Sequence, residues 1–178
     1  MASDAPRLSA ADARARSAWP VERLLAECEA DFYRASGPGG QKRNKTSSAV
    51  RLRHKPSGTI VIAEESRSQH ENKACAVERL RLALVLEHRL PLPSPLVWPM
   101  ANAGATDRLR VNEKNPAYLD VLGLVLDALH AASGKPSAAG ELLDVSGSSL
   151  TRFLARNPRA WAAAQQLRAQ FGLGPLQA

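Results

Sequence analysis

Residues Gly39, Gly40 and Gln41 end a stretch, SGPGGQ, in which three glycines and a proline fall within four positions. Glycine is entropically costly inside a helix or strand, and proline lacks a backbone donor, so we expect a loop here. Gln41 does not titrate near neutral pH, which excludes a general acid or base at this position. Its amide has two N–H donors and an acceptor oxygen, and its backbone is approachable. Such a loop can enter a narrow site formed by another molecule and offer hydrogen bonds there.

A self-contained active site is not indicated elsewhere in the chain. The spacing of Ser, His, Asp and Cys residues suggests no catalytic set, and we interpret His54 and His70 as structural or RNA-facing. Cys28 and Cys75 lack metal-ligand spacing, so we expect two reduced thiols and no metal. If the chain is an enzyme, its partner supplies much of the chemistry.

The positive charge of the chain is concentrated in its middle. Residues 1–33 carry a net charge of −2, residues 34–89 carry +7 and residues 90–178 carry +2, which together give the total of +7. A concentrated basic segment predicts a polyanionic partner, usually nucleic acid, with a solvated basic face as the alternative. No apolar run is long enough to span a bilayer, and the first twenty residues lack a secretory h-region.

Hydrophobic periodicity predicts the elements that position the glycine loop. Residues 20–29 have the pattern of a helix and residues 31–36 look extended. In residues 48–64, alternating apolar and basic residues, the turn Pro56-Ser57-Gly58 and a β-branched run indicate a hairpin with one basic face. Residues 68–90 carry a helical apolar stripe, with Ser68 and Glu71 as a possible capping box and Glu78, Arg79 and Arg81 facing out.

A proline-rich segment separates this region from a helical one. Four prolines fall within PLPSPLVWP, and three helical patterns follow Asn115-Pro116. The middle pattern, residues 134–157, has the spacing of a helix-turn-helix. We therefore expect an α+β chain, a hairpin-containing sheet packed on a long helix and then an all-α domain. The expected boundaries are a flexible terminus at 1–19, a first domain at 20–90, a linker at 91–115 and a helix-turn-helix-like domain at 116–178.

Several separated motifs in the first domain resemble one known family in a single register. SGPGGQ, then Asn44 and Thr46, SAVRLRH, PSG and RSQHENK resemble the catalytic domain of class I peptide chain release factors. The resemblance extends from about Tyr33 to Leu90, roughly a third of the chain. In that family the Gly-Gly-Gln loop enters the ribosomal peptidyl transferase centre and triggers hydrolysis of the ester between peptide and transfer RNA.

The resemblance implies a role for each motif. Gly39 and Gly40 allow close backbone approach, the Gln41 N–H stabilises the oxyanion or the leaving hydroxyl, and the Gln41 side chain places water. It implies ribosomal RNA contacts for a set of polar and basic residues: Lys42, Arg43, Asn44, Lys45, Arg51, Arg53, Arg67, Ser68, Gln69, Asn72 and Lys73. The implied partners are large-subunit ribosomal RNA and peptidyl-tRNA in the P site. The resemblance implies no cofactor, metal or membrane.

Two departures from the family pattern bear on the activity. Lys42 and Arg43 stand where most release factors have a small polar or His residue followed by Val, and the Lys resembles small codon-independent relatives. About thirty residues precede the catalytic domain, too few for a codon-recognition domain, so we expect no dependence on a stop codon. The chain is similar to ribosome-rescue members such as alternative rescue factor B, with a helical domain in place of their basic tail.

The sequence therefore predicts a cytoplasmic, ribosome-dependent peptidyl-tRNA hydrolase that rescues stalled translation. The alternative is a catalytically silent ribosome- or RNA-binding quality-control factor. A DNA-binding regulator ranks last, because it leaves the Gly-Gly-Gln segment unexplained. If the helical domain binds nucleic acid, its contacts would be Arg152, Arg156, Arg159 and Arg168; otherwise it is a small bundle without that role.

Overall fold

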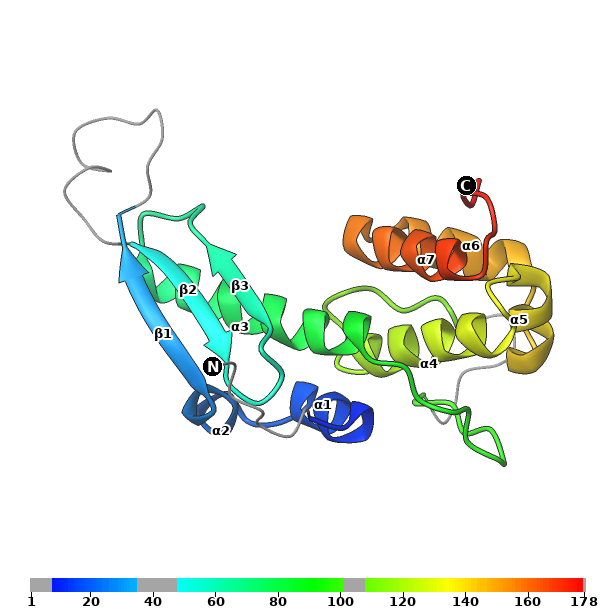
Figure 1. The fold of residues 1–178 in the computed structure, drawn as a ribbon, viewed down its shortest axis with the longest axis horizontal. Helices are drawn as coiled ribbons and strands as arrows, with labels where there is room; N and C mark the ends of the chain where they lie inside the picture. The colour runs from blue at the N-terminus through cyan, green and yellow to red at the C-terminus, as the bar shows by residue number, and fades with distance from the viewer. Residues whose placement is uncertain (1–7, 35–47, 101–107, 178) are drawn as a thin grey trace. The chain divides into compact units, whose positions relative to one another are not determined.

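A computed structural model describes residues 8–34, 48–100 and 108–177 of the 178-residue chain. These residues form a three-stranded antiparallel sheet and seven helices (Figure 1). The elements are α1 Ala10–Ser17, α2 Val21–Ala26, β1 Cys28–Tyr33, β2 Ala49–His54, β3 Ile60–Ala63, α3 Gln69–Glu87, α4 Tyr118–Ala131, α5 Pro136–Leu143, α6 Gly147–Ala155 and α7 Pro158–Gln170. The predicted α+β class is confirmed. The chain divides into two compact units, Met1–Leu84 and Val85–Ala178.

The sheet of the first unit is a meander in the order β1-β2-β3. The predicted hairpin is β2 and β3, closed by hydrogen bonds from the His54 N–H to the Thr59 carbonyl (2.9 Å) and from the Gly58 N–H to the His54 carbonyl (2.8 Å). Gly58 has φ +74°, a conformation that side-chain-bearing residues seldom adopt, so glycine suits this turn. On β2, Arg51 and Arg53 are exposed while Val50, Leu52 and His54 are buried, as the alternation predicted.

One hydrophobic cluster holds α3 against the inner face of the sheet. Leu80 and Leu84 of α3 and Val50 and Leu52 of β2 are fully buried in it. The predicted apolar stripe of the helix is therefore confirmed. Arg81, which was predicted to face out, is half-buried and donates to the carbonyls of Ser17 and Trp19, because α1 and its C-terminal turn lie against that side of the helix.

Two further predictions about the N-terminal segment differ from the structure. The predicted helix at residues 20–29 ends at Ala26, and Cys28 already belongs to β1, where it pairs with His54 of β2. The backbone groups after Ala26 form hydrogen bonds in the sheet instead of in a longer helix. Pairing with β2 therefore decides where the helix ends. The segment 1–19, expected to be flexible, contains α1. Ser9 caps this helix by accepting from the Asp12 N–H, and Ala13 is buried in the cluster.

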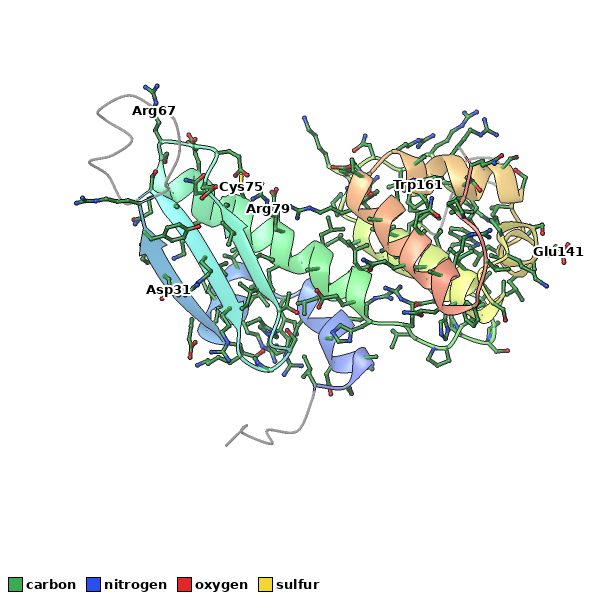
Figure 2. All side chains as sticks on the ribbon, turned by 45° about the horizontal axis from the view of Figure 1, so that its top comes forward. Asp31, Arg67, Cys75, Arg79, Glu141 and Trp161 are labelled. Atoms are coloured by element: carbon green, nitrogen blue, oxygen red, sulfur yellow. The ribbon has the colours of Figure 1, made fainter. Side chains whose placement is uncertain are left out.

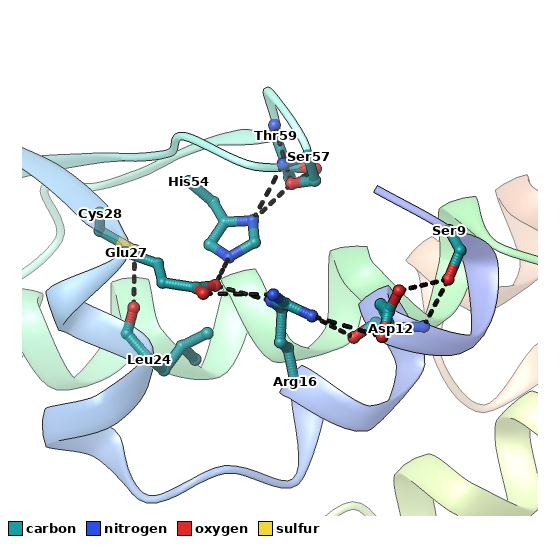
Figure 3. Close-up of polar contacts among 9 residues, drawn as sticks. All are labelled: Ser9, Asp12, Arg16, Leu24, Glu27, Cys28, His54, Ser57 and Thr59. Carbon is teal, nitrogen blue, oxygen red and sulfur yellow. Dashed lines mark hydrogen bonds and ion pairs between the residues drawn. The ribbon is translucent and has the colours of Figure 1, made fainter. Parts of the chain in front are cut away.

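A polar network joins α1, the α2–β1 junction and the hairpin (Figure 3). The Glu27 carboxylate accepts from Arg16 Nε (2.7 Å) and lies 3.1 Å from His54 Nε2. The other ring nitrogen of His54 accepts from the Ser57 N–H (3.3 Å), so Nε2 carries the proton and donates to Glu27. Hydrogen bonding from Arg16 lowers the pKa of Glu27, and burial lowers the pKa of His54 despite the nearby carboxylate. The network therefore holds a neutral histidine inside the unit.

The second unit is a helical bundle built on α4. Nearly every residue of α4 from Tyr118 to Leu129 is buried, and α5 and α7 both pack on it. The segment 88–117 has no helix or strand among its described residues, but Leu109 and Val111 are buried in the core of this unit. The part of the chain predicted to be a linker thus contributes side chains to the bundle.

The buried His54 gives the stability of the first unit a dependence on pH. Because its folded pKa lies below the usual 6.5, the unfolded chain takes up the proton first as the pH falls. The stabilisation is complete above pH ~6.5 and is lost as the pH falls through the folded pKa, with a slope of at most about 1.4 kcal/mol per pH unit. Urea titrations at several pH values between 7.5 and 5 give the free energy of unfolding at each pH. This free energy should fall less steeply with decreasing pH for His54→Gln than for the parent chain. Equal slopes would show that His54 does not titrate differently on folding.

Candidate functional site

The loop that contains the predicted catalytic residues lies between β1 and β2. Gly39, Gly40 and Gln41, and the basic stretch of Lys42, Arg43, Asn44 and Lys45, lie outside the described residues. Their flanks are described: β1 ends at Tyr33 and β2 begins at Ala49, and these two residues are partners in the ladder. The loop therefore leaves and re-enters the sheet at one end. α3 begins after the connection from β3 at the same end (Figure 1).

Asn72 joins three chain segments at this end of the sheet. Its side chain is fully buried, and its amide nitrogen donates to the Ser48 carbonyl (2.6 Å) and to the Ser66 carbonyl (2.8 Å). Its amide oxygen accepts from the Ser66 N–H (2.9 Å). Ser48 is the first described residue after the loop and Ser66 precedes α3, so one amide fixes both to the helix. With both donors and the oxygen engaged inside the protein, the Asn72 side chain supports the loop base and is not displayed to a partner.

The opposite flank of the loop has its own polar contact. The Tyr33 hydroxyl donates to Glu64 (3.3 Å), which follows β3. Burial raises the pKa of the Tyr33 phenol, and the Glu64 charge adds to that shift, so the hydroxyl keeps its proton and stays a donor. One flank of the loop is thus bonded to Asn72 of α3, and the other flank is bonded to Glu64 in the segment between β3 and α3.

Hydroxyl groups organise the start of α3. The Ser68 hydroxyl accepts from the Glu71 N–H (3.3 Å), which is half of the predicted capping box. The Glu71 carboxylate does not return to Ser68. It accepts from the Ser66 hydroxyl, whose oxygen in turn accepts from the Ser68 N–H (3.0 Å). The Ser66 hydroxyl therefore connects the Ser68 N–H to the Glu71 carboxylate, which in a capping box would be bonded directly.

Arg67 and Lys73 are the cations of the RSQHENK motif at this end. Arg67 is exposed and projects away from the body of the unit (Figure 2), and Lys73 is half-buried on the second turn of α3. Protein donors already engage the neighbouring acids: Tyr33 on Glu64, Arg79 on Glu65 (2.7 Å) and Ser66 on Glu71. The Arg79 hydrogen bond lowers the pKa of Glu65. Gln69 and Arg67 are both exposed, and the Arg67 guanidinium is displayed at this corner.

Arg51 and Arg53 occupy a different environment, the outer face of the sheet. Each lies opposite an acid on β1 in the ladder: Asp31 pairs with Arg51 (2.6 Å) and Glu29 with Arg53 (3.5 Å). All four side chains are about half exposed, and ion pairs of this kind are worth about 0–1 kcal/mol, so a phosphate could replace the acid at little cost. The outer face of the sheet is therefore charge-balanced.

Sequence reasoning did not identify Tyr33, Ser48 or Ser66 as supports of the loop. A signal for them existed: Asn72, Ala76, Leu80 and Leu84 are spaced by four and form one buried stripe of α3. An amide on a buried stripe must find hydrogen-bond partners, which for Asn72 are the two serine backbones.

Within the described residues, no group of three or more His, Cys, Asp or Glu side chains could hold a metal ion. A search of the same residues finds no helix with the length and apolarity to cross a membrane. The described site therefore consists of backbone and side-chain hydrogen-bond donors around the loop flanks.

Comparison with known proteins identifies the first unit. Residues 21–91 match the family model of the RF-1 domain. Peptide chain release factor 1 of Gluconobacter oxydans is 55% identical over 62 residues, which cover 35% of this chain and 18% of that protein. Peptide chain release factor 2 of Neisseria meningitidis is 54% identical over 64 residues, or 36% of this chain and 17% of that protein. Peptide chain release factor 1 of Endomicrobium trichonymphae is 37% identical over 94 residues, which cover 51% of this chain and 26% of that protein.

Residues 21–91 therefore match the RF-1 domain of peptide chain release factors, as the sequence motifs predicted. The chain covers about a quarter or less of the length of these relatives. The match to the domain model ends at residue 91, before the four helices of the second unit.

Replacing Asn72 tests its role as the support of the loop base. Asn72→Ala removes three hydrogen bonds and leaves backbone groups of Ser48 and Ser66 without partners in a buried site. We expect a loss of about 2–3 kcal/mol in the free energy of unfolding. His70→Ala, an exposed change on the same helix, is the matched control and should stay within about 0.5 kcal/mol. Urea titrations measure both, and equal losses would contradict the assignment.

Proposed function

We propose that this protein hydrolyses the ester of peptidyl-tRNA on the ribosome. The observation that carries the proposal is the RF-1 domain at residues 21–91, with Gly39-Gly40-Gln41 intact inside it. The proteins with which it shares 54–55% identity over this region are peptide chain release factors 1 and 2. Release of a peptide chain is the activity that these relatives' names describe.

In the proposed mechanism the chain supplies hydrogen bonds and position, and the ribosome supplies the rest of the site. The Gln41 backbone N–H stabilises the oxyanion or the departing ribose hydroxyl, and the Gln41 amide orders the attacking water. Gly39 and Gly40 permit close approach to the substrate. Asn72 and Tyr33 act as positioning residues, since Asn72 fixes one flank of the loop to α3 and Tyr33 bonds the other flank to Glu64, directly after β3.

The proposed partners are large-subunit ribosomal RNA and the peptidyl-tRNA in the P site, in the cytoplasm. Lys42, Arg43, Asn44 and Lys45 would follow Gln41 toward RNA phosphates. Arg67, Ser68, Gln69 and Lys73 would contact phosphates at the base of the loop, and Arg51 and Arg53 would do so by exchanging their carboxylate partners. Asn72 supports these contacts from inside the protein.

We further propose that release does not depend on a stop codon, so that the protein rescues stalled ribosomes. Lys42 directly after the Gly-Gly-Gln triplet supports this, because it resembles the small codon-independent members. A second candidate function is a ribosome-binding quality-control factor without hydrolytic activity. Arg43 favours it, since it replaces the aliphatic residue of most release factors.

Peptide release from purified ribosomal complexes tests the hydrolase directly. The complexes are an empty messenger channel, a sense codon, a stop codon and isolated large subunits with peptidyl-tRNA. We expect release that ignores the codon. Gln41→Ala keeps the backbone N–H and should slow release by roughly ten-fold. Gln41→Pro removes that N–H and should slow release by roughly 10²–10³-fold.

Absence of release from all four complexes, with ribosome binding retained, would overturn the hydrolase and support the silent factor. Release confined to the stop codon would overturn only the rescue assignment. Equal effects of Gln41→Ala and Gln41→Pro would contradict the role of the backbone N–H.

Asn72 and Arg67 should affect different kinetic parameters of release. Asn72→Ala should lower the rate at saturating factor and leave the half-saturating concentration within about two-fold, because it misplaces the loop without removing a contact to RNA. Arg67→Gln should raise the half-saturating concentration and leave the saturated rate unchanged. A titration of factor against one ribosomal complex measures both. The reverse pattern would contradict these roles.

A further inference from the structure

Helices α5 and α6 of the second unit form a helix-turn-helix with unusually close backbones. The two helices are joined by three residues, Asp144, Val145 and Ser146. A Cβ on Gly140 would lie 2.5 Å from the Val145 carbonyl oxygen, and one on Gly147 would lie 2.9 Å from the Pro136 backbone. No larger residue fits at either position without moving the backbone. The glycines therefore set the approach of the two helices.

The turn and the core of this motif have equally definite geometry. Asp144 takes the left-handed conformation (φ 52°, ψ 48°) that ends α5, and its carboxylate pairs with Arg108 (3.0 Å). Ser146 caps α6 by accepting from the Ser149 N–H (3.1 Å). Leu150 and Phe153 are buried beneath α6, so the opposite side of that helix faces solvent. In helix-turn-helix proteins the second helix is the one that meets nucleic acid.

The solvent side of α6 has the chemistry of a phosphate-binding surface. Ser148, Arg152 and Arg156 are exposed and spaced by four, so they share one side of the helix; we call them the α6 face. The sequence from Val145 to Ala178 contains four arginines and no acid. Figure 2 marks the neighbouring helices by Glu141 on α5 and Trp161 on α7.

The nearby charged groups leave the α6 face cationic. Asp144 is paired with Arg108, and Glu141 is exposed on α5. Glu113 accepts from the side chain of Asn157 (2.9 Å), the residue next to Arg156, so it is the acid nearest that end of the face. Arg156 donates one N–H to the Leu109 carbonyl (3.2 Å), which steadies its guanidinium. Arg168 does not belong to the α6 face, because its guanidinium donates to the carbonyls of Gly134 and Gly174.

We propose that the α6 face binds the phosphate backbone of double-helical RNA. The face has arginines and a hydroxyl but no aromatic side chain, which favours phosphate contacts over stacking on unpaired bases. A protein partner fits less well, because the cores of protein interfaces are depleted of charge. An RNA major groove is too narrow for α6 to read bases, so the contacts are to backbone and independent of sequence. The choice of RNA over DNA rests on the function proposed above.

Fluorescence anisotropy with the full chain tests this surface. The probes are a labelled RNA hairpin, a DNA duplex of the same sequence and an unstructured RNA of equal length. We expect tightest binding to the hairpin. Arg152→Gln should weaken it about ten-fold and make the slope of log K against log salt shallower by roughly 0.7–0.9. Lys114→Gln removes the same charge from an exposed position outside the motif and should change affinity by less than two-fold.

The other outcomes are equally informative. Hairpin affinity that is insensitive to Arg152→Gln, or equally sensitive to Lys114→Gln, would overturn the α6 face as the binding surface. Tighter binding to the DNA duplex would overturn the choice of RNA. Gln41→Ala should bind the hairpin like the parent chain, so failure of the release assay and failure of this proposal are separable.

Discussion

A single buried amide, that of Asn72, holds together the end of the sheet where the segment between β1 and β2 is attached. Asn72 bonds to the residue at which the loop rejoins the sheet and to the residue that precedes α3. A catalytic group that works by hydrogen bonding alone gains its effect from position, since it neither donates nor accepts a proton in the reaction. The scaffold around the loop is therefore part of the proposed chemistry, although Asn72 itself is buried inside the protein.

The arginines of the chain lie in three different environments, which the total charge does not distinguish. On the outer sheet face, Arg51 and Arg53 lie opposite acids, and the face is balanced. Arg81 and Arg168 are internal donors to backbone carbonyls. Arg67 and Arg152 are exposed at the two surfaces assigned to RNA. The net charge of +7 therefore does not by itself say which cations are available to a polyanion.

Many of the helices and strands could be predicted from hydrophobic periodicity, because that periodicity reflects the burial of one side of each element. The alternation on β2 and the stripe on α3 were predicted correctly since each packs one face on the same cluster. The boundary at Ala26 was not, because Cys28 pairs with a strand distant in sequence. α1 was missed because little beyond Ala13 marks its buried side. The loop residues were identified by their motif, whereas their supports act largely through backbone groups, which leave no trace in side-chain type.

The ion pair between Asp144 and Arg108 limits how far the helix-turn-helix can be regarded as a module. A non-glycine residue in the left-handed conformation is strained by about 1–2 kcal/mol, and here its carboxylate bonds to an arginine that precedes α4. Arg156, at the other end of the motif, bonds to the neighbouring Leu109. Residues 136–156 grafted onto another scaffold would leave both partners, Arg108 and Leu109, behind. The motif belongs to its bundle, and its transfer would require Arg108 and Leu109 to travel with it.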